Sequence, residues 1–197
     1  KYNAKVQRGT GNPFTYDANI PSRVAKFYGT GSDYITLYPL DYNYTFNSGT
    51  TRTFLFWFKS TTTAPFEIMT LLDYGSNKVN AIILNGTHLL YVSNESASLS
   101  YPFTLQADTW THVAMTYDGG FVDFYKDGVL ISSNDKSYFP DLYENWILNF
   151  GNDLNGFTSD YFDGFMDNIM IFDRVLTAGE IKSIYGNQTV VNDAIYY

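Results

Sequence analysis

The sequence predicts an all-β protein, built as a two-sheet antiparallel sandwich, from three observations. Short runs rich in Tyr, Phe, Val, Ile and Thr recur along the chain, and these residues favour pleated, half-buried strands. Asp-Gly and Asn-Gly pairs separate several of the runs, as in tight hairpins. Aromatic residues make up 19% of the 197 residues and charged residues only 16%, so the chain has enough apolar surface to bury a core. A sandwich of this length is commonly one domain.

Eleven runs are expected to be strands, with no long helix between them. Runs 53–58 and 169–172 are apolar at consecutive positions, which is typical of central strands with both faces covered. Apolar and more polar residues alternate in a third run, so Val122 and Phe124 are expected to be buried while Tyr125 lies on the wetter face. The expected strands cover residues 24–28, 34–38, 51–59, 66–73, 78–84, 87–93, 110–117, 120–126, 129–133, 146–150 and 161–173.

Three turn pairs predict hairpins between neighbouring strands. They are Asn-Gly at 85–86 and Asp-Gly at 118–119 and 127–128. Each pair tolerates the positive φ angles that a tight primed turn requires. The pairs therefore set the register of the strands that they join.

One short C-terminal helix is expected at 177–185. Thr177 can cap its first turn, Glu180 completes a capping box, and Gly186 can adopt the left-handed conformation that ends a helix. The side chains expected to face the sandwich are those of Ile181, Ile184 and Tyr185.

Composition excludes several classes of function. The formal net charge is −8 and no cluster of Lys or Arg is present, so nucleic acid is not an expected partner. The chain has no cysteine, which excludes disulfides and thiolate metal sites. The longest apolar runs, 54–58 and 81–84, are far too short for a membrane-spanning helix, so no membrane insertion is expected.

Four tripeptides match the N-glycosylation acceptor, a number close to that expected by chance from this content of Asn, Ser and Thr. They fit an extracellular protein, secreted or attached to a surface, and would make it a glycoprotein. The acceptor residues are Asn43, Asn85, Asn94 and Asn187.

Residues 110–119 read Trp-Thr-His-Val-Ala-Met-Thr-Tyr-Asp-Gly, and Val-Asp-Phe-Tyr-Lys-Asp-Gly follows at 122–128. This hairpin, the strand and helix motif at 161–176, and the runs 27–35 and 53–59 resemble the laminin-G-like, concanavalin A-like jelly-roll family. The resemblance implies two curved antiparallel sheets packed face to face, a jelly-roll sandwich with one short C-terminal helix. Many relatives carry Asp where this chain has Tyr28, which puts any ligand role of that position in question.

The resemblance divides the chain into three parts. The laminin-G-like jelly-roll domain is expected over 23–186. Residues 1–22 contain Gly and Pro without sustained periodicity and are expected to form an N-terminal arm. Residues 187–197 are expected to form a short C-terminal tail.

Catalysis is not expected. Hydrolases on related folds use paired carboxylates on one strand face, whereas this chain has four Glu and no Glu-x-Asp-x-Glu arrangement. Asp163 and Asp167 share strand parity, but Gly164 between them favours a structural or ion-binding role. A nucleophilic triad would need His112, which lies within a strand and is expected to be hydrogen-bonded inside the sheet. Two histidines and no cysteine also disfavour zinc.

Calcium is the metal that the resemblance implies, because many relatives carry one such ion on the sandwich and calcium takes carboxylate and backbone oxygens. The candidate ligands are Asp33 and Asp167, helped by backbone carbonyls near Gly29. The two carboxylates are expected to approach from the two ends of the domain. The alternative is that these aspartates only form turns.

Aromatic side chains could stack on sugar rings, although most must be core. Trp57 and Trp110 lie in the strand motifs and are expected to be structural. Trp146, beside Tyr143, is expected nearer a loop and is the candidate ligand contact, with packing as the alternative.

Two functions fit these observations. The first is a non-catalytic extracellular recognition or cell-adhesion module that binds glycan or protein. The second is a structural subunit of an extracellular filament, sheath or capsid, which self-assembles with copies of itself through its terminal arms. No residue pattern identifies the ligand, because fold does not dictate function.

Overall fold

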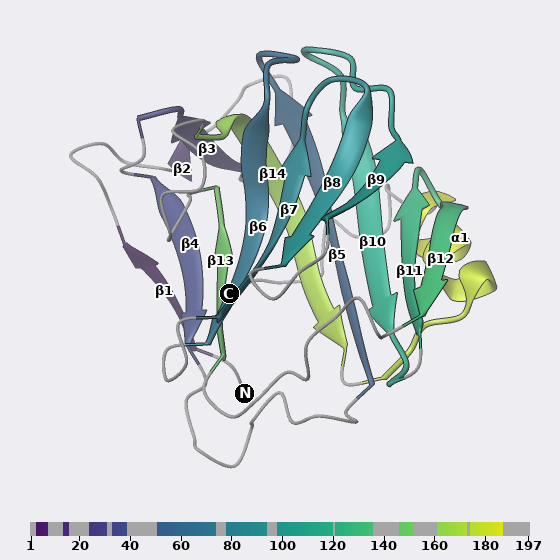
Figure 1. The fold of residues 1–197 in the computed structure, drawn as a ribbon. Helices are drawn as coiled ribbons and strands as arrows, with labels where there is room; N and C mark the ends of the chain where they lie inside the picture. The colour runs from purple at the N-terminus through teal and green to yellow at the C-terminus, as the bar shows by residue number, and fades with distance from the viewer. Residues whose placement is uncertain are drawn as a thin grey trace.

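The computed structural model describes residues 3–7, 14–15, 24–30, 33–38, 51–73, 78–93, 98–119, 121–135, 146–151, 161–172 and 174–186. Two sheets face each other, and a short helix lies outside them (Figure 1). Neighbouring strands in both sheets pair antiparallel. This arrangement confirms the predicted jelly-roll sandwich.

Sheet A and sheet B each contain seven strands among the described residues. Sheet A has the spatial order β1 (Asn3–Gln7), β4 (Tyr34–Tyr38), β13 (Trp146–Phe150), β6 (Phe66–Asp73), β7 (Lys78–Leu84), β8 (His88–Ser93) and β9 (Ser98–Pro102). Sheet B has the order β12 (Val129–Asp135), β11 (Phe121–Lys126), β10 (Thr111–Tyr117), β5 (Arg52–Ser60), β14 (Asp163–Phe172), β3 (Val24–Tyr28) and β2 (Phe14–Thr15).

The core between the sheets is largely aromatic. Phe56 of sheet B packs edge-on against Phe150 of sheet A, with ring centroids 5.3 Å apart. The ring centroid of Phe66 lies 6.3 Å from that of Phe58 and 5.2 Å from that of Phe162. Full burial of such a side chain stabilises the fold by about 1.5–3 kcal/mol. Because strand side chains alternate, these positions also decide which residues face outward.

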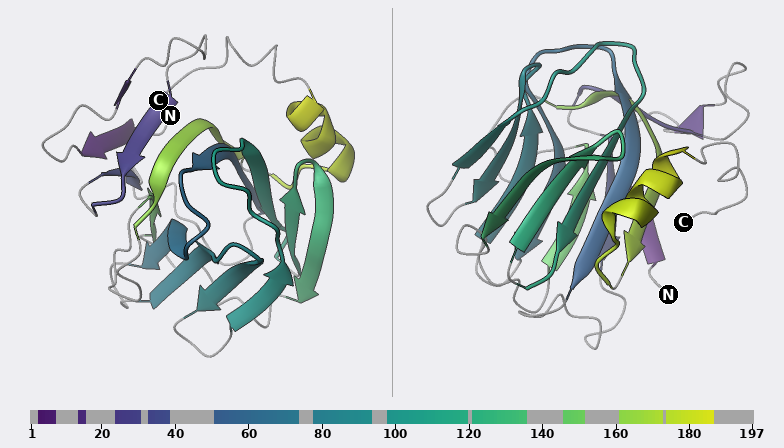
Figure 2. Two further views of the ribbon diagram at one scale, coloured as in Figure 1. Left: turned by 90° about the horizontal axis from the view of Figure 1, so that it is seen from above. Right: turned by 90° about the vertical axis from the view of Figure 1, so that its right-hand side faces the viewer.

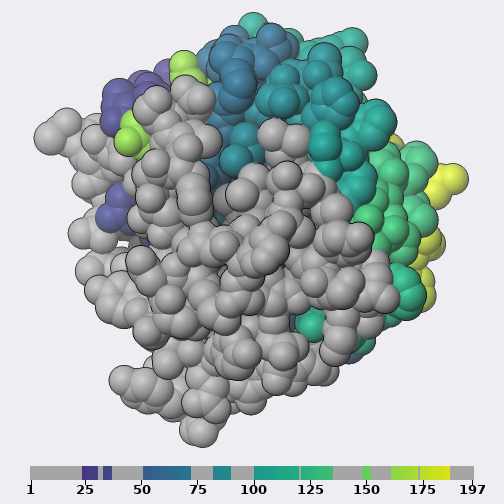
Figure 3. All heavy atoms as spheres, in the orientation of Figure 1, coloured from purple at the N-terminus to yellow at the C-terminus, as the bar shows by residue number. Residues whose placement is uncertain are grey.

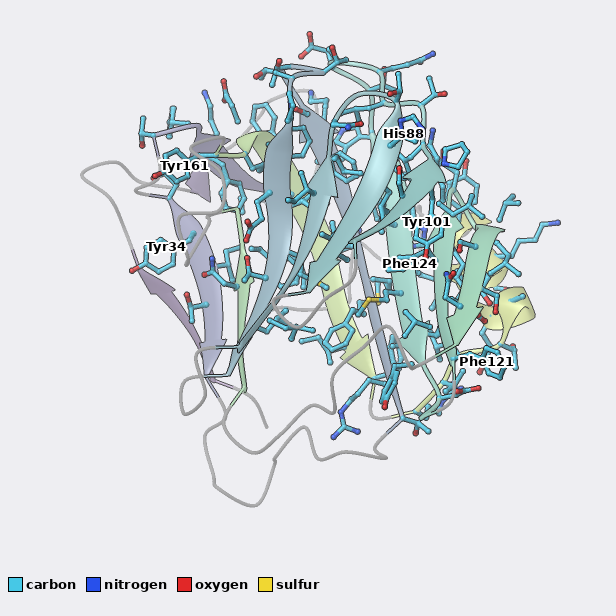
Figure 4. All side chains as sticks on the ribbon, viewed as in Figure 1. Tyr34, His88, Tyr101, Phe121, Phe124 and Tyr161 are labelled. Atoms are coloured by element: carbon cyan, nitrogen blue, oxygen red, sulfur yellow. The ribbon has the colours of Figure 1, made fainter. Side chains whose placement is uncertain are left out.

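The two sheets also meet at one pair of edges. Tyr101 of β9 packs against Phe124 of β11, with ring centroids 5.6 Å apart (Figure 4). Phe121, at the start of β11, is 51% exposed and lies at the lower end of the sandwich in that view. In the same orientation, the surface at the upper right belongs to the middle of the chain, coloured teal (Figure 3).

The three predicted turn pairs all form hairpins. Gly86, Gly119 and Gly128 have φ angles of 81°, 86° and 75°, and Asp127 has a φ of 49°. In the turn at 85–86, the backbone N–H of His88 donates to the Asn85 side-chain oxygen at 2.9 Å. Local turn chemistry therefore sets these registers, as expected.

All eleven expected strands are present. β5 lies in the middle of sheet B beside β14, which confirms that runs 53–58 and 169–172 are central. The structure adds three strands that the pattern did not indicate, namely β1, β2 and β9. They lie at or next to sheet ends, where backbone pairing needs less apolar sequence, and β9 ends at Pro102, as suits an edge strand.

Two of these strands belong to the segment expected to be an N-terminal arm. β1 pairs with β4, and β2 pairs with β3. Their backbone hydrogen bonds are therefore made within the domain. The tail at 187–197 lies outside the described residues.

Helix α1 (Ala178–Gly186) covers part of the outer face of sheet B (Figure 2). The capping box is formed: Glu180 N–H donates to the Thr177 hydroxyl at 3.2 Å, and Thr177 N–H donates to the Glu180 carboxylate at 2.8 Å. Ile181 is fully buried beside Leu55. No helix among the described residues is long and apolar enough to cross a membrane.

The helix changes the expected exposure of β11. Val122 and Phe124 are buried as predicted, but Tyr125, expected on a wetter face, is only 4% exposed. Tyr125 lies in the same apolar cluster as Ile181 of α1. Strand alternation assigned Tyr125 to the outer face correctly, and the helix then covered that face.

Candidate functional site

A row of four side chains crosses the outer face of sheet B, three on adjacent strands and one just before a fourth. Lys26 of β3 is paired with Phe165 of β14, and Phe165 is paired with Lys59 of β5. Thr111 is paired with Phe58, so Trp110, which precedes β10, comes next to Lys59. We call Lys26, Phe165, Lys59 and Trp110 the aromatic–lysine row.

Strand alternation places this row outside the core. Phe27, Phe58 and Met166 have the opposite parity on three of the same strands, and all belong to the interior cluster. The four side chains of the row are half-buried. Central strands therefore hold the row rigidly while part of each side chain remains exposed.

The lysines lie over the rings of their neighbours. The Lys59 ammonium lies 4.8 Å from the centroid of Phe165 and 5.7 Å from that of Trp110. The Lys26 ammonium lies 5.6 Å from the centroid of Phe165 and 4.5 Å from that of Tyr28, which is 43% exposed. These distances are those of cation–π contacts, which orient both ammonium groups along the row.

Neither Lys26 nor Lys59 forms an ion pair with a carboxylate of the described residues. The chain as a whole carries 20 acidic and 12 basic residues, so anionic partners are plentiful in its composition. Arg174, in contrast, is paired with Glu180 at 2.6 Å. Among the residues that the structure describes, the two lysines of the row therefore contact rings and not counter-charges.

A buried row follows next on the same face. The rings of Trp57 and His112 are 5.1 Å apart on paired positions of β5 and β10, and Tyr185 of α1 stacks on Trp57 at 5.4 Å and 14°. His112 has no exposed surface. Helix α1 therefore covers this row, and it does not cover the aromatic–lysine row.

The expectation that the His112 side chain is hydrogen-bonded within the sheet is wrong. Both ring nitrogens are buried without a hydrogen-bond partner, and only its backbone N–H is engaged, donating to Asp127 Oδ1 at 3.0 Å. Desolvation lowers the pKa of His112 from 6.5 to about 4. The ring is therefore neutral near pH 7 and contributes packing.

The expected calcium ligands do not all come together. Asp33 Oδ2 accepts a hydrogen bond from the N–H of Tyr28 at 3.0 Å, next to Gly29. Tyr28 is paired with Asp163, and a Cβ placed on Gly29 would lie 3.0 Å from that of Asp163. Asp167 lies four residues further along β14, which is roughly 13 Å of strand.

The donor set of Asp33, Asp167 and Gly29 therefore does not fit one ion. Asp163 borders the same turn as Asp33 and Gly29, in the place that the sequence assigned to Asp167. Among the described residues, no group of three His, Cys, Asp or Glu side chains could hold a metal. Calcium binding stays a prediction.

The other sequence candidates are spread along the fold. Trp146 is the first residue of β13, paired with Asp73. Asn85 lies in its hairpin turn and its side chain accepts the His88 N–H. The candidates outside the described residues are Tyr143, Asn43, Asn94 and Asn187.

The two described Glu side chains have structural contacts. Glu67 is fully buried on β6 and accepts a hydrogen bond from the Thr70 hydroxyl. Glu180 accepts hydrogen bonds from Arg174, which lower its pKa to about 2, and from Thr177 in the capping box. The described residues thus bring no pair of Glu carboxylates together for acid and nucleophile roles.

Sequence reasoning missed the aromatic–lysine row. Trp110 was expected to be structural, and Lys26, Lys59 and Phe165 were not selected. The available signal was strand parity, which puts each residue on an outer face. Parity could not show that β3, β14, β5 and β10 are neighbours, because they are far apart in the sequence.

Comparison with known structures finds the same fold in binding domains. The binding domain of botulinum neurotoxin serotype G superposes with a TM-score of 0.72 at 17% identity, covering 95% of this chain and 47% of that one. The chain thus spans about half the length of that domain. A complex of domain 4 of a GH43 extracellular arabinanase from Geobacillus stearothermophilus with arabinotriose has a TM-score of 0.68 at 19% identity, covering 93% and 87%.

A third similar structure is a heptameric pentraxin from Limulus polyphemus, with a TM-score of 0.61 at 14% identity, covering 92% of this chain and 81% of that one. No curated protein matches the sequence. The laminin-G family described as the concanavalin A-like lectin/glucanases superfamily matches residues 29–182. This match covers most of the chain and includes the hairpin and strand motifs described above. The chain therefore belongs to the concanavalin A-like lectin/glucanases superfamily, in its laminin-G branch.

Proposed function

We propose that this chain is a non-catalytic module that binds a glycan through the aromatic–lysine row of sheet B. The observation that carries the proposal is the row itself, in which Phe165, on a central strand, and Trp110, just before another, are half-buried on the outer face of sheet B. Aromatic rings pack well against the apolar faces of sugar rings, while polar groups beside them can bind the hydroxyls.

Rigidity supports this assignment. Phe165 lies on β14, between β3 and β5, and its backbone pairs on both sides. Ordering a flexible side chain at a binding site costs about 0.5–1.5 kcal/mol, so preorganised rings favour binding. Lys26 and Lys59 flank Phe165 and supply hydrogen-bond donors on both sides of it.

The similar structures support the same class of function. One is a domain of an arabinanase in complex with arabinotriose, and another is a neurotoxin ligand-binding domain in complex with N-acetylneuraminic acid. An extracellular setting is part of the proposal, because such a module meets glycans at cell surfaces or in secreted material.

The test compares binding by two alanine variants of the row with binding by a matched control. A glycan array identifies the ligand, and isothermal titration then measures its dissociation constant. Phe165→Ala and Trp110→Ala should each weaken binding about tenfold, as loss of one ring contact does. Phe121→Ala removes an exposed ring at the opposite end of sheet B and should leave affinity unchanged.

All three variants should keep the melting temperature of a folded sandwich, so that a loss of binding reports the site. Equal affinities for the unchanged chain and both row variants would place the glycan elsewhere. Absence of binding to every glycan on the array would refute the module itself.

A further inference from the structure

We propose that the glycan carries an anionic group, a carboxylate or a sulfate ester, which binds between Lys26 and Lys59 over the edge of Phe165. This inference rests on the proposed function, because it names the chemical class of ligand for the same row. It is carried by the position of the two ammonium groups and by the charges around them.

The two ammonium groups border the same ring. Lys26 Nζ lies 5.6 Å and Lys59 Nζ lies 4.8 Å from the Phe165 centroid. Two positive charges that border one ring repel each other, and no carboxylate of the described residues forms an ion pair with either. An anion between them removes the repulsion and gains two charge-assisted hydrogen bonds.

The surrounding charges make this position selective. The chain has a net charge of −8, so its overall field disfavours anions. On β14, Asp163 and Asp167 flank Phe165 on the same face. Because these two carboxylates repel an anion placed above or below the row, an anionic group is stabilised only within the row itself. The ligand's charge is therefore confined to the line from Lys26 to Lys59.

The ends of the row suit the uncharged parts of the ligand. Tyr28 lies beside Lys26, and Trp110 lies beside Lys59. Aromatic side chains at both ends with cations between them match an oligosaccharide in which sugar rings stack and one acidic substituent points to the lysines. A neutral oligosaccharide would gain the stacking and hydrogen bonds to its hydroxyls, but not the stronger hydrogen bonds to a charged group.

The experiment compares charged and neutral forms of the same backbone. Oligogalacturonate and its methyl ester test a carboxylate, and sulfated and unsulfated dextran oligosaccharides test a sulfate ester. Isothermal titration at low ionic strength should give at least one acidic form an affinity about tenfold above its neutral partner, as one or two charge-assisted hydrogen bonds do. The acidic arm that binds identifies the group.

Charge variants assign the effect to the row. Lys26→Gln with Lys59→Gln should make the acidic and neutral forms bind equally, whereas Lys59→Arg keeps the charge and should keep the preference. Lys182→Gln, at an exposed position of α1, removes one positive charge away from the row and should have no effect. Added salt should weaken the acidic form more than the neutral one.

The outcomes separate the two proposals. Equal affinity for the acidic and neutral forms of both pairs overturns the anionic class while leaving a glycan-binding row intact. A preference for the acidic form that survives the double glutamine variant, with the melting temperature unchanged, also overturns it. A chain that binds no glycan on the array refutes the proposed function.

Discussion

Protonation of the buried histidine should make the domain unstable in mild acid. His112 has an ordinary pKa of 6.5 in the unfolded chain, and burial lowers it to about 4 in the folded protein. Above the higher value both states are neutral and His112 has no pH-dependent effect. Below pH 6.5 the unfolded chain binds a proton at His112 that the folded protein does not bind. The free energy of unfolding therefore falls as the pH drops from 6.5 toward 4.

The size of the effect follows from the two values. The pKa falls from 6.5 to about 4, and each unit corresponds to about 1.4 kcal/mol, so the full loss is about 3 kcal/mol. A typical domain has a free energy of unfolding of about 5–15 kcal/mol, so this loss is a large share of it. The cause is that Trp57 and Tyr185 surround the ring while no group accepts its N–H.

The assay is urea unfolding followed by tryptophan fluorescence, from about pH 7 down to about pH 4.5, for the unchanged chain and His112→Leu. At the lower pH the unchanged chain should lose about 2.5 kcal/mol more than the variant. Asp127 at the β11–β12 turn, Asp167 beside Trp57, and Lys182 and Tyr185 on α1 are the titratable groups around His112. All four are present in both proteins, so the difference isolates His112.

An equal loss of stability by both proteins over this range would refute the role of His112. That result would mean that the ring is hydrated or paired in solution. A variant that is less stable at neutral pH because of a packing defect does not affect the comparison, since only the pH-dependent difference is used.

Two further predictions concern local structure. Gly164→Ala should destabilise the fold by about 3 kcal/mol in urea unfolding, because a Cβ there would lie 2.1 Å from the Lys59 carbonyl oxygen. Gly179→Ala in α1 is the matched control, because the atom nearest to a Cβ there is 3.9 Å away and the stability should stay level or rise. Equal losses of stability in the Gly164 and Gly179 variants would contradict this explanation. Thr177→Ala should lower the free energy of unfolding by about 1 kcal/mol in thermal unfolding, because the capping box is lost, whereas Thr177→Ser should lower it little. An alanine variant as stable as the unchanged chain would refute the role of the cap.

Much of the fold was predictable because its signals are local. The hairpin at 118–119 needs only an Asp-Gly pair between two strand-like runs, and the N-terminal cap of α1 needs only Thr177 and Glu180 three residues apart. β1 and β2 were missed because their pairing is supplied by β4 and β3, which an isolated reading of residues 1–22 does not include.

The candidate site was predictable only in part. Asp33 and Gly29 are four positions apart in the sequence, and the structure places the Asp33 carboxylate on the N–H of Tyr28, next to Gly29. Their expected partner Asp167 lies along β14 from the turn, and Asp163 takes its place beside Gly29 because the register pairs Asp163 with Tyr28. Register between distant strands depends on how the whole interior packs, which no short motif encodes.

The sequence by itself determined the all-β class, the hairpin registers, the helix cap and the parity that puts Lys59 and Phe165 on an outer face, because each depends on residues a few positions apart. Only the tertiary structure decided that β3, β14, β5 and β10 lie side by side, and that α1 buries His112 while leaving Trp110 beyond its cover. Strand order and coverage are set by the burial of the shared aromatic core, a property of the whole chain.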